Sequence, residues 1–237
     1  MRIEHTYGQR SAAEKRDPKV RYFIACEGSK TEYQYFDGIV QNRNYIGINS
    51  LVEIVPVEHE SANSENHPLK LYEAARKAID KCDNYFPNSG DRFCLIVDRD
   101  KNSFIERQYD ELLSYVHAGK VSLFVSNPCF EFWLLLHFGD CKDYDQQKLL
   151  DNKKSGKKTY TEQLLGKCLG GSYNKVRLKY KFNNYFKDRV KTAVNNAELH
   201  AVELEHLKNS IGTNVGRLIK MMLNNRQRED DISRKDQ

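Results

Sequence analysis

Strand-like and helix-like segments alternate along the chain from Lys19 to about Phe138. The strand-like segments are short runs of β-branched, aromatic and other apolar residues, and the segments between them place apolar side chains at helical spacing. Strands that alternate with helices form a mainly parallel sheet through right-handed crossovers, and the helices cover both faces of that sheet. The alternation therefore predicts an α/β core over residues 19–140.

Four runs are the predicted strands of this sheet. The third run, RFCLIVD, has the clearest pattern of a buried strand, whereas the second contains Pro56, which cannot donate a hydrogen bond to a neighbouring strand. Pro56 therefore places the second run at an edge of the sheet or at its own strand end. The predicted strands cover residues 20–26, 51–57, 92–98 and 121–126.

The predicted helices follow these strands. One begins at Thr31, and two amphipathic segments cover residues 67–82 and 104–119. Asn127 and Pro128 fit the N-cap and the first position of a further helix, which carries the apolar run FEFWLLLHF.

The composition changes in the second half of the chain. Residues 141–225 include a stretch rich in lysine and asparagine, and they are predicted to form a basic, largely helical region that packs on the core. The spacing of its apolar residues predicts one long helix from about 184 to 208 and a final helix over 213–223. We expect a flexible N-terminal arm over residues 1–18 and a disordered tail over residues 226–237.

The totals argue against a membrane protein. Apolar residues make up 39% of the 237 residues and charged residues 30%, and no run approaches the roughly 20 apolar residues of a membrane span. The N-terminal sequence lacks the apolar segment of a secretory signal. The six cysteines are scattered, form no CxxC pair and fit reduced structural thiols. We therefore expect a cytoplasmic protein, and the net charge of +5 permits nucleic-acid binding without indicating it.

Acidic residues follow three of the predicted strands. Glu27 comes directly after the first strand, and Glu32 lies about one helical turn later. Asp98 and Asp100 mark the end of the third strand, and Glu131 follows the last one. Ligand sites in open α/β sheets lie beyond the carboxyl ends of the strands, so we expect these carboxylates to converge on one edge of the sheet.

Such a cluster of carboxylates indicates a metal site. Like charges repel unless a cation lies between them or their pKa values rise. Oxygen ligands of this kind suit Mg²⁺ or Mn²⁺ rather than zinc, and metal ions held in this way commonly serve phosphoryl transfer. Each acid taken alone also has a structural interpretation, because helix N-termini and solvated loops favour acidic residues. The set together favours the metal site.

Other catalytic signatures have little support. The stretch EGSKTE is neither a P-loop nor a GxGxxG fingerprint, although Gly28 would let the backbone approach a ligand closely. The sequence contains no GxSxG or HExxH motif. Ser126 and His137 could each touch a phosphate, but a half-buried packing role is favoured for His137 because the sequence fixes no acid beside it.

Basic residues could hold a nucleic acid near the acids. Four lysines surround Gly156 in an expected flexible loop, and basic residues alternate with apolar and aromatic ones over residues 175–182. Phosphate contacts make binding steeply salt-dependent, and aromatic side chains can stack on unpaired bases. The alternation also fits an amphipathic strand with its aromatic residues in the core. The predicted nucleic-acid-binding residues are Lys30, Lys153, Lys154, Lys157, Lys158, Lys175, Arg177 and Lys179.

Several motifs resemble known families. CEGSKTEYQYF followed by IVDRD resembles the Toprim fold, which topoisomerases, primases and OLD-type nucleases share. EGSKTEYQYF, VDRD, SNPCFEFWLLLHF and NSIGTNVGRLI together resemble more closely the RloB-like family, which is also named for the AbiL abortive-infection system. These motifs extend over residues 22–219. Ile211 departs from the simpler turn expected in the last motif, so Thr213 is not assigned to the site.

The resemblance implies a Toprim-like, metal-dependent nuclease of DNA or RNA. It also implies a role in bacterial anti-phage defence, together with an AAA-type ATPase encoded nearby. Glu27 would bind Mg²⁺ or Mn²⁺ as the glutamate after the first strand, and Asp98 and Asp100 would bind it as the DxD pair. Glu32 and Glu131 match further acids of nuclease-like Toprim proteins, and they would complete the ligand shell or position the attacking water.

Two other functions stay open at this point. The chain could be a non-catalytic regulatory or nucleic-acid-binding subunit of an ATPase complex, in which the basic region is the docking surface. It could also be a primase-like nucleotidyltransferase, although no obvious motif that cradles phosphates supports this. A homo-oligomer is compatible with each function.

Overall fold

The computed structural model describes most of the chain between residues 20 and 224. The arm predicted over residues 1–18 and the tail predicted over residues 226–237 lie outside the described residues. The described ranges are 20–28, 30–48, 51–54, 68–80, 90–101, 104–119, 121–171, 173–175 and 178–224.

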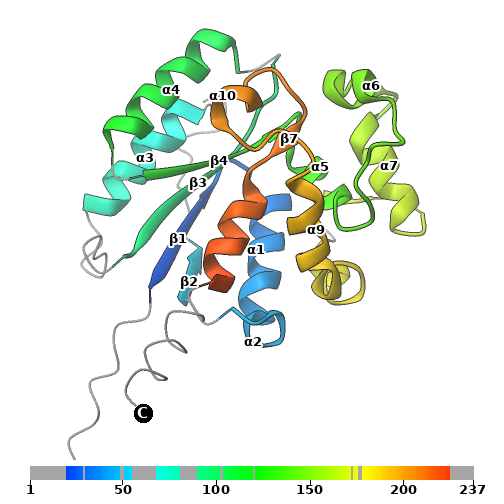
Figure 1. Ribbon diagram of the computed structural model, residues 1–237, viewed down its shortest axis with the longest axis horizontal. Coiled ribbons are helices and arrows are strands. Elements are labelled where there is room, and N and C mark those ends of the chain that lie inside the picture. The colour runs from blue at the N-terminus through cyan, green and yellow to red at the C-terminus, as the bar shows by residue number, and fades with distance from the viewer. Residues whose placement is uncertain are drawn as a thin grey trace, which may run out of the picture.

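A sheet of five strands forms the centre of the described part of the molecule (Figure 1). The strand order is β2-β1-β3-β4-β7, and β7 is antiparallel to β4 whereas the other pairs are parallel. The predicted α/β fold with a mainly parallel sheet is confirmed, and β2 lies at an edge, which is one of the two positions that Pro56 allowed. The strands are β1 (Arg21–Cys26), β2 (Leu51–Ile54), β3 (Arg92–Asp98), β4 (Val121–Asn127) and β7 (Gly212–Thr213).

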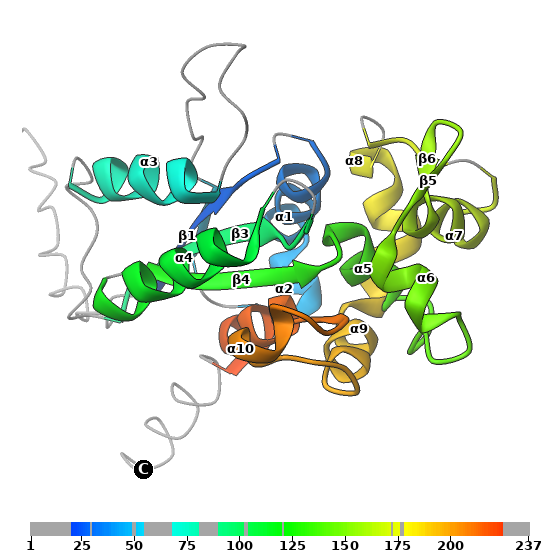
Figure 2. The same cartoon turned by 90° about the horizontal axis from the view of Figure 1, so that it is seen from above.

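Helices cover both faces of this sheet, as predicted (Figure 2). Alternate residues of β1 face two separate cores, since Tyr22 and Ile24 belong to one and Phe23 and Ala25 to the other. The core of Tyr22 is covered by α1 (Thr31–Gln41), α5 (Phe130–Leu135), α9 (Val190–Ala197) and a final helix over residues 215–224. The core of Phe23 is covered by α3 (Pro68–Asp80), α4 (Glu106–Ala118) and α10 (Leu204–Leu207). The short helix α2 (Arg43–Ile46) follows α1.

The start of α5 differs from the prediction. Asn127 is the last residue of β4 rather than a helix cap, its peptide bond to Pro128 is cis, and the helix begins only at Phe130. Asn127 stays in the sheet because its backbone pairs with Gly212 of β7. Its side-chain Nδ2 also donates to the Leu207 carbonyl at 2.7 Å. The helix-start prediction for Asn127 and Pro128 is therefore wrong.

The basic C-terminal region is largely helical but also contains a β-hairpin. The hairpin replaces the flexible loop predicted around Gly156, which occupies its turn with a φ of 67°. Glycine adopts this left-handed conformation at no steric cost. The elements are α6 (Gln146–Asp151), the hairpin strands β5 (Lys154–Ser155) and β6 (Lys158–Thr159), α7 (Tyr160–Cys168) and α8 (Leu178–Lys181).

The prediction of a single long helix from about residue 184 to residue 208 is wrong. A π-helical turn and a 3₁₀ turn precede α9, and α10 follows as a separate helix. The chain leaves the helical path because Ala201 bridges to Gly212, and the Ala201 N–H donates to the Ile211 carbonyl at 3.2 Å. The two turns are η3 (Phe182–Phe186) and η4 (Lys187–Arg189).

The C-terminal region shares an apolar core with α1 and α5. Tyr35 lies in an aromatic cluster, with the Phe130, Trp133 and Phe182 ring centres between 5.4 and 6.1 Å from its own. Gly38 lets Phe182 approach α1, because a Cβ at residue 38 would collide with the Phe182 ring. The boundaries proposed for the domains stay predictions.

Two further expectations concern the whole chain. In the ranges that the structure describes, no helix is long and apolar enough to cross a bilayer. Cys82 lies outside these ranges. The cysteines within them carry free thiols, as expected, and these are Cys26, Cys94, Cys129, Cys141 and Cys168.

Candidate functional site

The acidic residues of the sequence motifs meet at the carboxyl edge of the sheet. Parallel pairing places Asp98 at the end of β3 opposite Ser126 of β4. The Glu27 N–H donates to the Ile96 carbonyl at 3.0 Å, which continues the pairing of β1 with β3 by one residue. The ends of β1, β3 and β4 therefore lie side by side and carry their acids to one place.

Asp98 is at the centre of this cluster. Its Oδ1 accepts a hydrogen bond from the N–H of Phe130 in α5 at 2.8 Å, and its own N–H donates to Oε2 of Glu27 at 3.2 Å. Burial raises the pKa of Asp98 well above its ordinary value. The carboxylates of Glu32, Glu131 and Glu27 raise it further. The four carboxyl groups are thus close enough to affect one another's protonation.

Glu32 comes from the first turn of α1 and is 7% exposed. Its carboxyl group lies against Gly28, and a Cβ at residue 28 would collide with it. Glycine at residue 28 therefore gives the Glu32 carboxyl group room to lie against the backbone, which is a role that the sequence did not reveal. Burial and the Glu131 carboxylate raise the pKa of Glu32 to about 7, although Lys175 opposes the rise.

Glu27 and Asp100 occupy the outer part of the cluster. Burial raises the pKa of Glu27 to about 8, against the effect of the hydrogen bond from Asp98, and the Glu32 and Asp100 charges contribute to the rise. Asp100 itself is exposed beyond the end of β3. The charge of Asp100 contributes to the raised pKa of Glu27, while the Asp100 side chain is accessible to solvent.

Arg99, between the two aspartates of the DxD pair, is directed into the protein. It is 2% exposed, its guanidinium donates to the Phe104 carbonyl, and its Nε donates to the Lys208 carbonyl at 3.1 Å. The guanidinium carbon lies 5.1 Å from the centre of the Tyr109 ring. Arg99 therefore anchors the loop after β3 to α4 and to the end of α10.

Glu131 lies deepest and is the acid with the most hydrogen-bond donors around it. It is 3% exposed, and its Oε1 accepts from the Tyr173 hydroxyl at 3.0 Å. The Thr31 hydroxyl lies 3.5 Å from the same oxygen and 2.9 Å from the Tyr173 hydroxyl. The Lys175 ammonium completes this set at 3.2 Å from Oε1 of Glu131. An acid inside the apolar FEFWLLLHF run thus has the partners that burial requires.

Lys175 joins two acids. Its ammonium also lies 3.3 Å from Oε1 of Glu162 in α7. Burial disfavours the ammonium, but Glu131 and Glu162 outweigh this effect and raise the pKa of Lys175 above its ordinary value. The structure therefore places Lys175, predicted as a nucleic-acid contact, in the acidic site itself.

Sequence reasoning missed Thr31, Tyr173 and Glu162 as members of this site. Thr31 lies within the EGSKTE motif, so its position offered a signal. Tyr173 and Glu162 offered none, because their contacts join segments that are far apart in the sequence.

The donor set suits Mg²⁺ or Mn²⁺ in its chemistry but is not assembled for an ion in this conformation. Carboxylate oxygens are the ligands that these cations prefer, and the mutual repulsion of the acids would be relieved by positive charge. Among the described residues, however, no three acidic, histidine or cysteine side chains are arranged so that they could hold one ion. Glu27, Asp98 and Asp100 would have to move closer together to share a cation.

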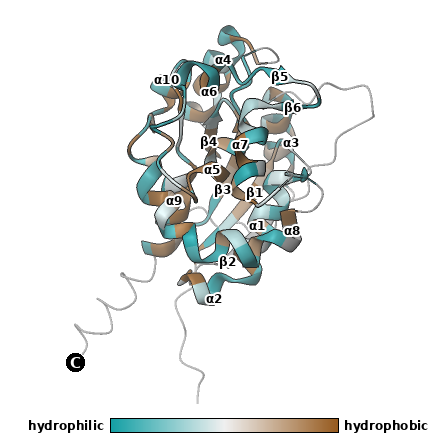
Figure 3. Ribbon diagram, turned by 90° about the vertical axis from the view of Figure 1, so that its right-hand side faces the viewer, coloured by the Kyte–Doolittle hydropathy of each residue, from teal (hydrophilic) through white to brown (hydrophobic). Residues whose placement is uncertain are grey.

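The predicted nucleic-acid-binding lysines divide into two places. Lys154, Lys157 and Lys158 lie on the β5–β6 hairpin, which Figure 3 shows as a largely hydrophilic segment, and Lys153 precedes it. Lys153 is 84% exposed and pairs with Asp151 at 3.4 Å. Lys30 is exposed at the start of α1, beside the acids.

Within the alternating segment over residues 175–182, residues 178–182 are helical rather than a strand. Leu178 and Phe182 are buried in the core that covers α1, so they are not available for stacking on bases. This agrees with the core interpretation of the apolar residues, although the element type was wrong. Arg177 and the Lys179 side chain lie outside the described residues.

The residues considered as phosphate contacts are buried. His137 is 1% exposed, and its ring nitrogens are hydrogen-bonded to the Tyr35 hydroxyl and the Trp133 carbonyl, each at 3.1 Å. Burial lowers the pKa of His137 to about 3, so it is a neutral packing residue. The Ser126 hydroxyl is hydrogen-bonded to the Thr213 hydroxyl at 2.8 Å, inside the sheet edge.

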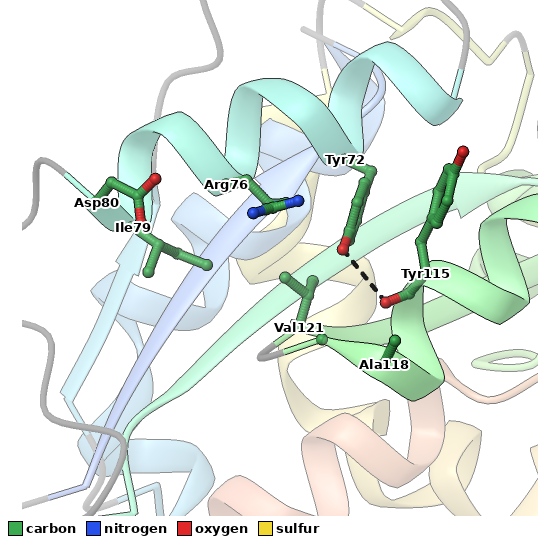
Figure 4. A pocket seen from close by; sticks show the side chains of 8 residues that line it. Tyr72, Arg76, Ile79, Asp80, Tyr115, Ala118 and Val121 are labelled. Atoms are coloured by element: carbon green, nitrogen blue, oxygen red, sulfur yellow. Dashed lines mark hydrogen bonds between the residues drawn. The ribbon is translucent and has the colours of Figure 1, made fainter.

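A separate cavity of about 300 Å³ lies at the opposite end of the sheet (Figure 4). It is lined by residues of α3 and α4, among them the stacked rings of Tyr72 and Tyr115, and by Val121 at the start of β4. Because the acids lie beyond the other end of β4, the cavity is not part of the acidic site.

The fold and the site together define an α/β protein with a buried carboxylate cluster at the carboxyl edge of a mainly parallel sheet. A family model described as RloB-like protein matches residues 22–222, so the chain belongs to the RloB-like protein family. Comparisons with curated proteins and with solved structures give no match.

Proposed function

We propose that this chain is a nuclease that depends on Mg²⁺ or Mn²⁺ and hydrolyses phosphodiester bonds of DNA or RNA. The convergence of Glu27, Glu32 and Glu131 on Asp98 is the observation that carries the proposal. Buried carboxyl groups that repel one another destabilise a protein, and a cation at this position would relieve the repulsion. Four acids gathered at one place therefore favour a bound cation over a purely structural role.

Glu27, Asp98 and Asp100 would hold the ion, which when bound would stabilise charge on the attacking and leaving oxygen atoms. Glu32 and Glu131 would complete the shell or orient the attacking water. Burial raises the pKa of Glu27 to about 8, so this carboxyl holds a proton at neutral pH in the metal-free protein. Deprotonation of Glu27 would therefore accompany the uptake of a cation.

The β5–β6 hairpin is the surface proposed to hold the nucleic acid. The Thr159 N–H of β6 donates to Oε2 of Glu162 at 2.8 Å, and Glu162 in turn contacts Lys175 in the acidic site. The hairpin is thus connected to the carboxylate cluster through two contacts. Its exposed lysines supply the positive charge that a polyanion needs near the acids.

Removal of two hairpin lysines is expected to weaken nucleic-acid binding with little dependence on base sequence. The double variant Lys154→Ala/Lys157→Ala should lower the slope of log affinity against log salt by about 1.4–1.8, because each phosphate contact contributes roughly 0.7–0.9. Fluorescence anisotropy with a labelled oligonucleotide at several salt concentrations measures this slope. Lys70→Ala/Lys77→Ala on α3 is the matched control, and an unchanged slope in the hairpin variant would contradict the assignment.

The cellular role that we propose rests on the RloB-like resemblance. It supports a cytoplasmic effector of anti-phage abortive infection that works with an AAA-type ATPase encoded nearby. Under this proposal the ATPase controls when the nuclease acts, so cleavage by the chain alone is not required.

A second candidate function is a non-catalytic, nucleic-acid-binding subunit of such an ATPase complex. Two observations favour it: the described acids are not arranged to share one ion, and Lys175 already compensates part of their charge. In this case the carboxylates and Lys175 form a structural network, and the ATPase supplies the catalytic activity of the complex.

Thermal unfolding with Mn²⁺ separates the two functions. At a hundred times its dissociation constant, Mn²⁺ is expected to add about 2.7 kcal/mol to the free energy of unfolding, which corresponds to about 5–10 °C in Tm. Asp98→Asn should remove this rise, since asparagine keeps an Oδ1 acceptor for Phe130 N–H but loses the charge. Asp143→Asn in an exposed loop should keep it. An equal rise in the Tm of Asp98→Asn would exclude Asp98 as a ligand. If Mn²⁺ does not raise the Tm of the unmodified protein, the result would favour the non-catalytic subunit.

A further inference from the structure

Lys175 places a positive charge inside the acidic cluster. Its ammonium lies 3.2 Å from Glu131 and 3.3 Å from Glu162, while 49% of its side chain is exposed. The residue comes from the basic C-terminal region, between α7 and α8, and not from the strands that carry the acids. A cation from another part of the chain therefore occupies the place where the carboxylates require positive charge.

Three side-chain and backbone contacts hold this cation in position. The Tyr173 hydroxyl donates to Oε1 of Glu131 and lies 2.9 Å from the Thr31 hydroxyl. The Lys175 carbonyl accepts a hydrogen bond from Nε2 of Gln34 in α1 at 2.9 Å. Residues 173 and 175 are thus fastened to α1 and α5, the two helices that carry Glu32 and Glu131.

The donors around Oε1 of Glu131 occupy an oxygen that a metal ion in the cluster would otherwise use. Tyr173, Lys175 and Thr31 all approach this single oxygen. Mg²⁺ binds carboxylate oxygen at about 2.0–2.1 Å and requires near-octahedral geometry, so it would compete with these donors for the same lone pairs. The positive charge of the Lys175 ammonium would also repel a divalent ion bound to Glu131.

We propose that Tyr173 and Lys175 form an internal latch, in which the Lys175 ammonium must leave Glu131 before a divalent ion can bind to the acidic cluster. This inference rests on the metal site of the proposed function and adds the regulation of that site. The latch keeps the cluster compensated in charge and without an ion until Lys175 is withdrawn. Because about half of the Lys175 side chain is exposed, the phosphate of a bound nucleic-acid strand is an alternative acceptor for its ammonium.

The test is the affinity for Mn²⁺ of the full chain, measured by calorimetry. Lys175→Met keeps the aliphatic stem and removes the charge, and it is expected to bind Mn²⁺ about threefold to tenfold more tightly than the unmodified protein. Lys148→Met removes the same kind of charge from an exposed lysine that pairs with Asp145 outside the cluster, and it should leave the affinity unchanged. Tyr173→Phe is a second variant, which removes one donor to Glu131 but keeps the ring, and a roughly twofold gain is expected.

Hydrogen exchange supplies a readout that does not depend on affinity. Saturating Mn²⁺ should accelerate amide exchange in peptides that contain Tyr173 and Lys175, because the latch opens. Binding of Mn²⁺ that requires Asp98 but is no tighter in Lys175→Met or Tyr173→Phe would overturn the latch and leave the proposed function intact. Absence of Mn²⁺ binding from the unmodified protein and from both latch variants would overturn both proposals.

Discussion

Under the proposed nuclease function, asparagine in place of Asp98 is expected to reduce nucleic-acid cleavage by more than about a hundredfold while the protein stays folded. Changes next to metal ligands cost about 10–100-fold in activity, and loss of the central carboxylate should cost more. The fold should tolerate the change, because the new amide oxygen would still accept the hydrogen bond from Phe130 and one repelling charge is removed. Gel analysis of single- and double-stranded DNA and RNA with Mn²⁺ measures the effect.

The cleavage experiment should include the AAA-type ATPase that the proposed function implies, because under this proposal the ATPase controls when the nuclease acts. Asp143→Asn is the control, as it removes the same kind of charge from an exposed loop outside the cluster. Circular dichroism shows whether each variant is folded. Undiminished cleavage by folded Asp98→Asn would mean that the acidic cluster is not the catalytic centre.

The metal-free protein is expected to lose stability as the pH rises from about 6.5 to 8. Glu27 and Glu32 have folded-state pKa values of about 8 and about 7, above their ordinary value of 4.5. In this range the unfolded chain has already released these protons while the folded protein still holds part of them. Unfolding therefore becomes more favourable by about 1.4 kcal/mol per pH unit for each such proton, and the total fall is about 2–3 kcal/mol.

The lower limit of this pH range is set by His137. The folded-state pKa of His137 is about 3, below its ordinary value of 6.5. His137 therefore stabilises the folded protein above pH 6.5, and this contribution is lost as the pH falls below 6.5. Its dependence on pH is opposite in sign to that of Glu27 and Glu32. Urea unfolding in EDTA at several pH values measures the dependence. Glu27→Gln/Glu32→Gln should make this dependence of stability on pH clearly shallower. If the stability of the unmodified protein is constant or rises up to pH 8, the pKa values of Glu27 and Glu32 are not raised in the folded protein.

The sheet and the meeting of its acids were predictable because their signals are local. Each strand is a short apolar run, and Glu27 and Asp98 stand next to the ends of two of them. The rule that parallel strands end at one edge then places the acids together without any knowledge of side-chain contacts. The same reasoning located Glu131, since an acid inside an apolar run needs partners when it is buried.

The errors arose where distant segments compete with local preference. Asn127 has the sequence of a helix cap, but pairing with Gly212 keeps it in β4. The apolar stripe over residues 184–208 has helical spacing, but the bridge from Ala201 to the same glycine interrupts it. Lys175 is an ordinary lysine in sequence, and only the packing of α7 and α8 against α1 and α5 brings it to Glu131. Tertiary contacts decided each of these positions.

The two-residue strand β7 also affects the order in which a newly made chain can become functional. Gly212 and Thr213 complete the sheet beside β4, and Leu218, Ile219 and Met222 of the following helix are fully buried in the core of α1 and α5. Ribosomal synthesis proceeds from the N-terminus, so every acid of the cluster emerges long before these residues do. A nascent chain that stops short of them lacks both the closing strand and the helix that seals the core. We therefore expect that a chain which ends before residues 212–222 does not form a stable acidic site.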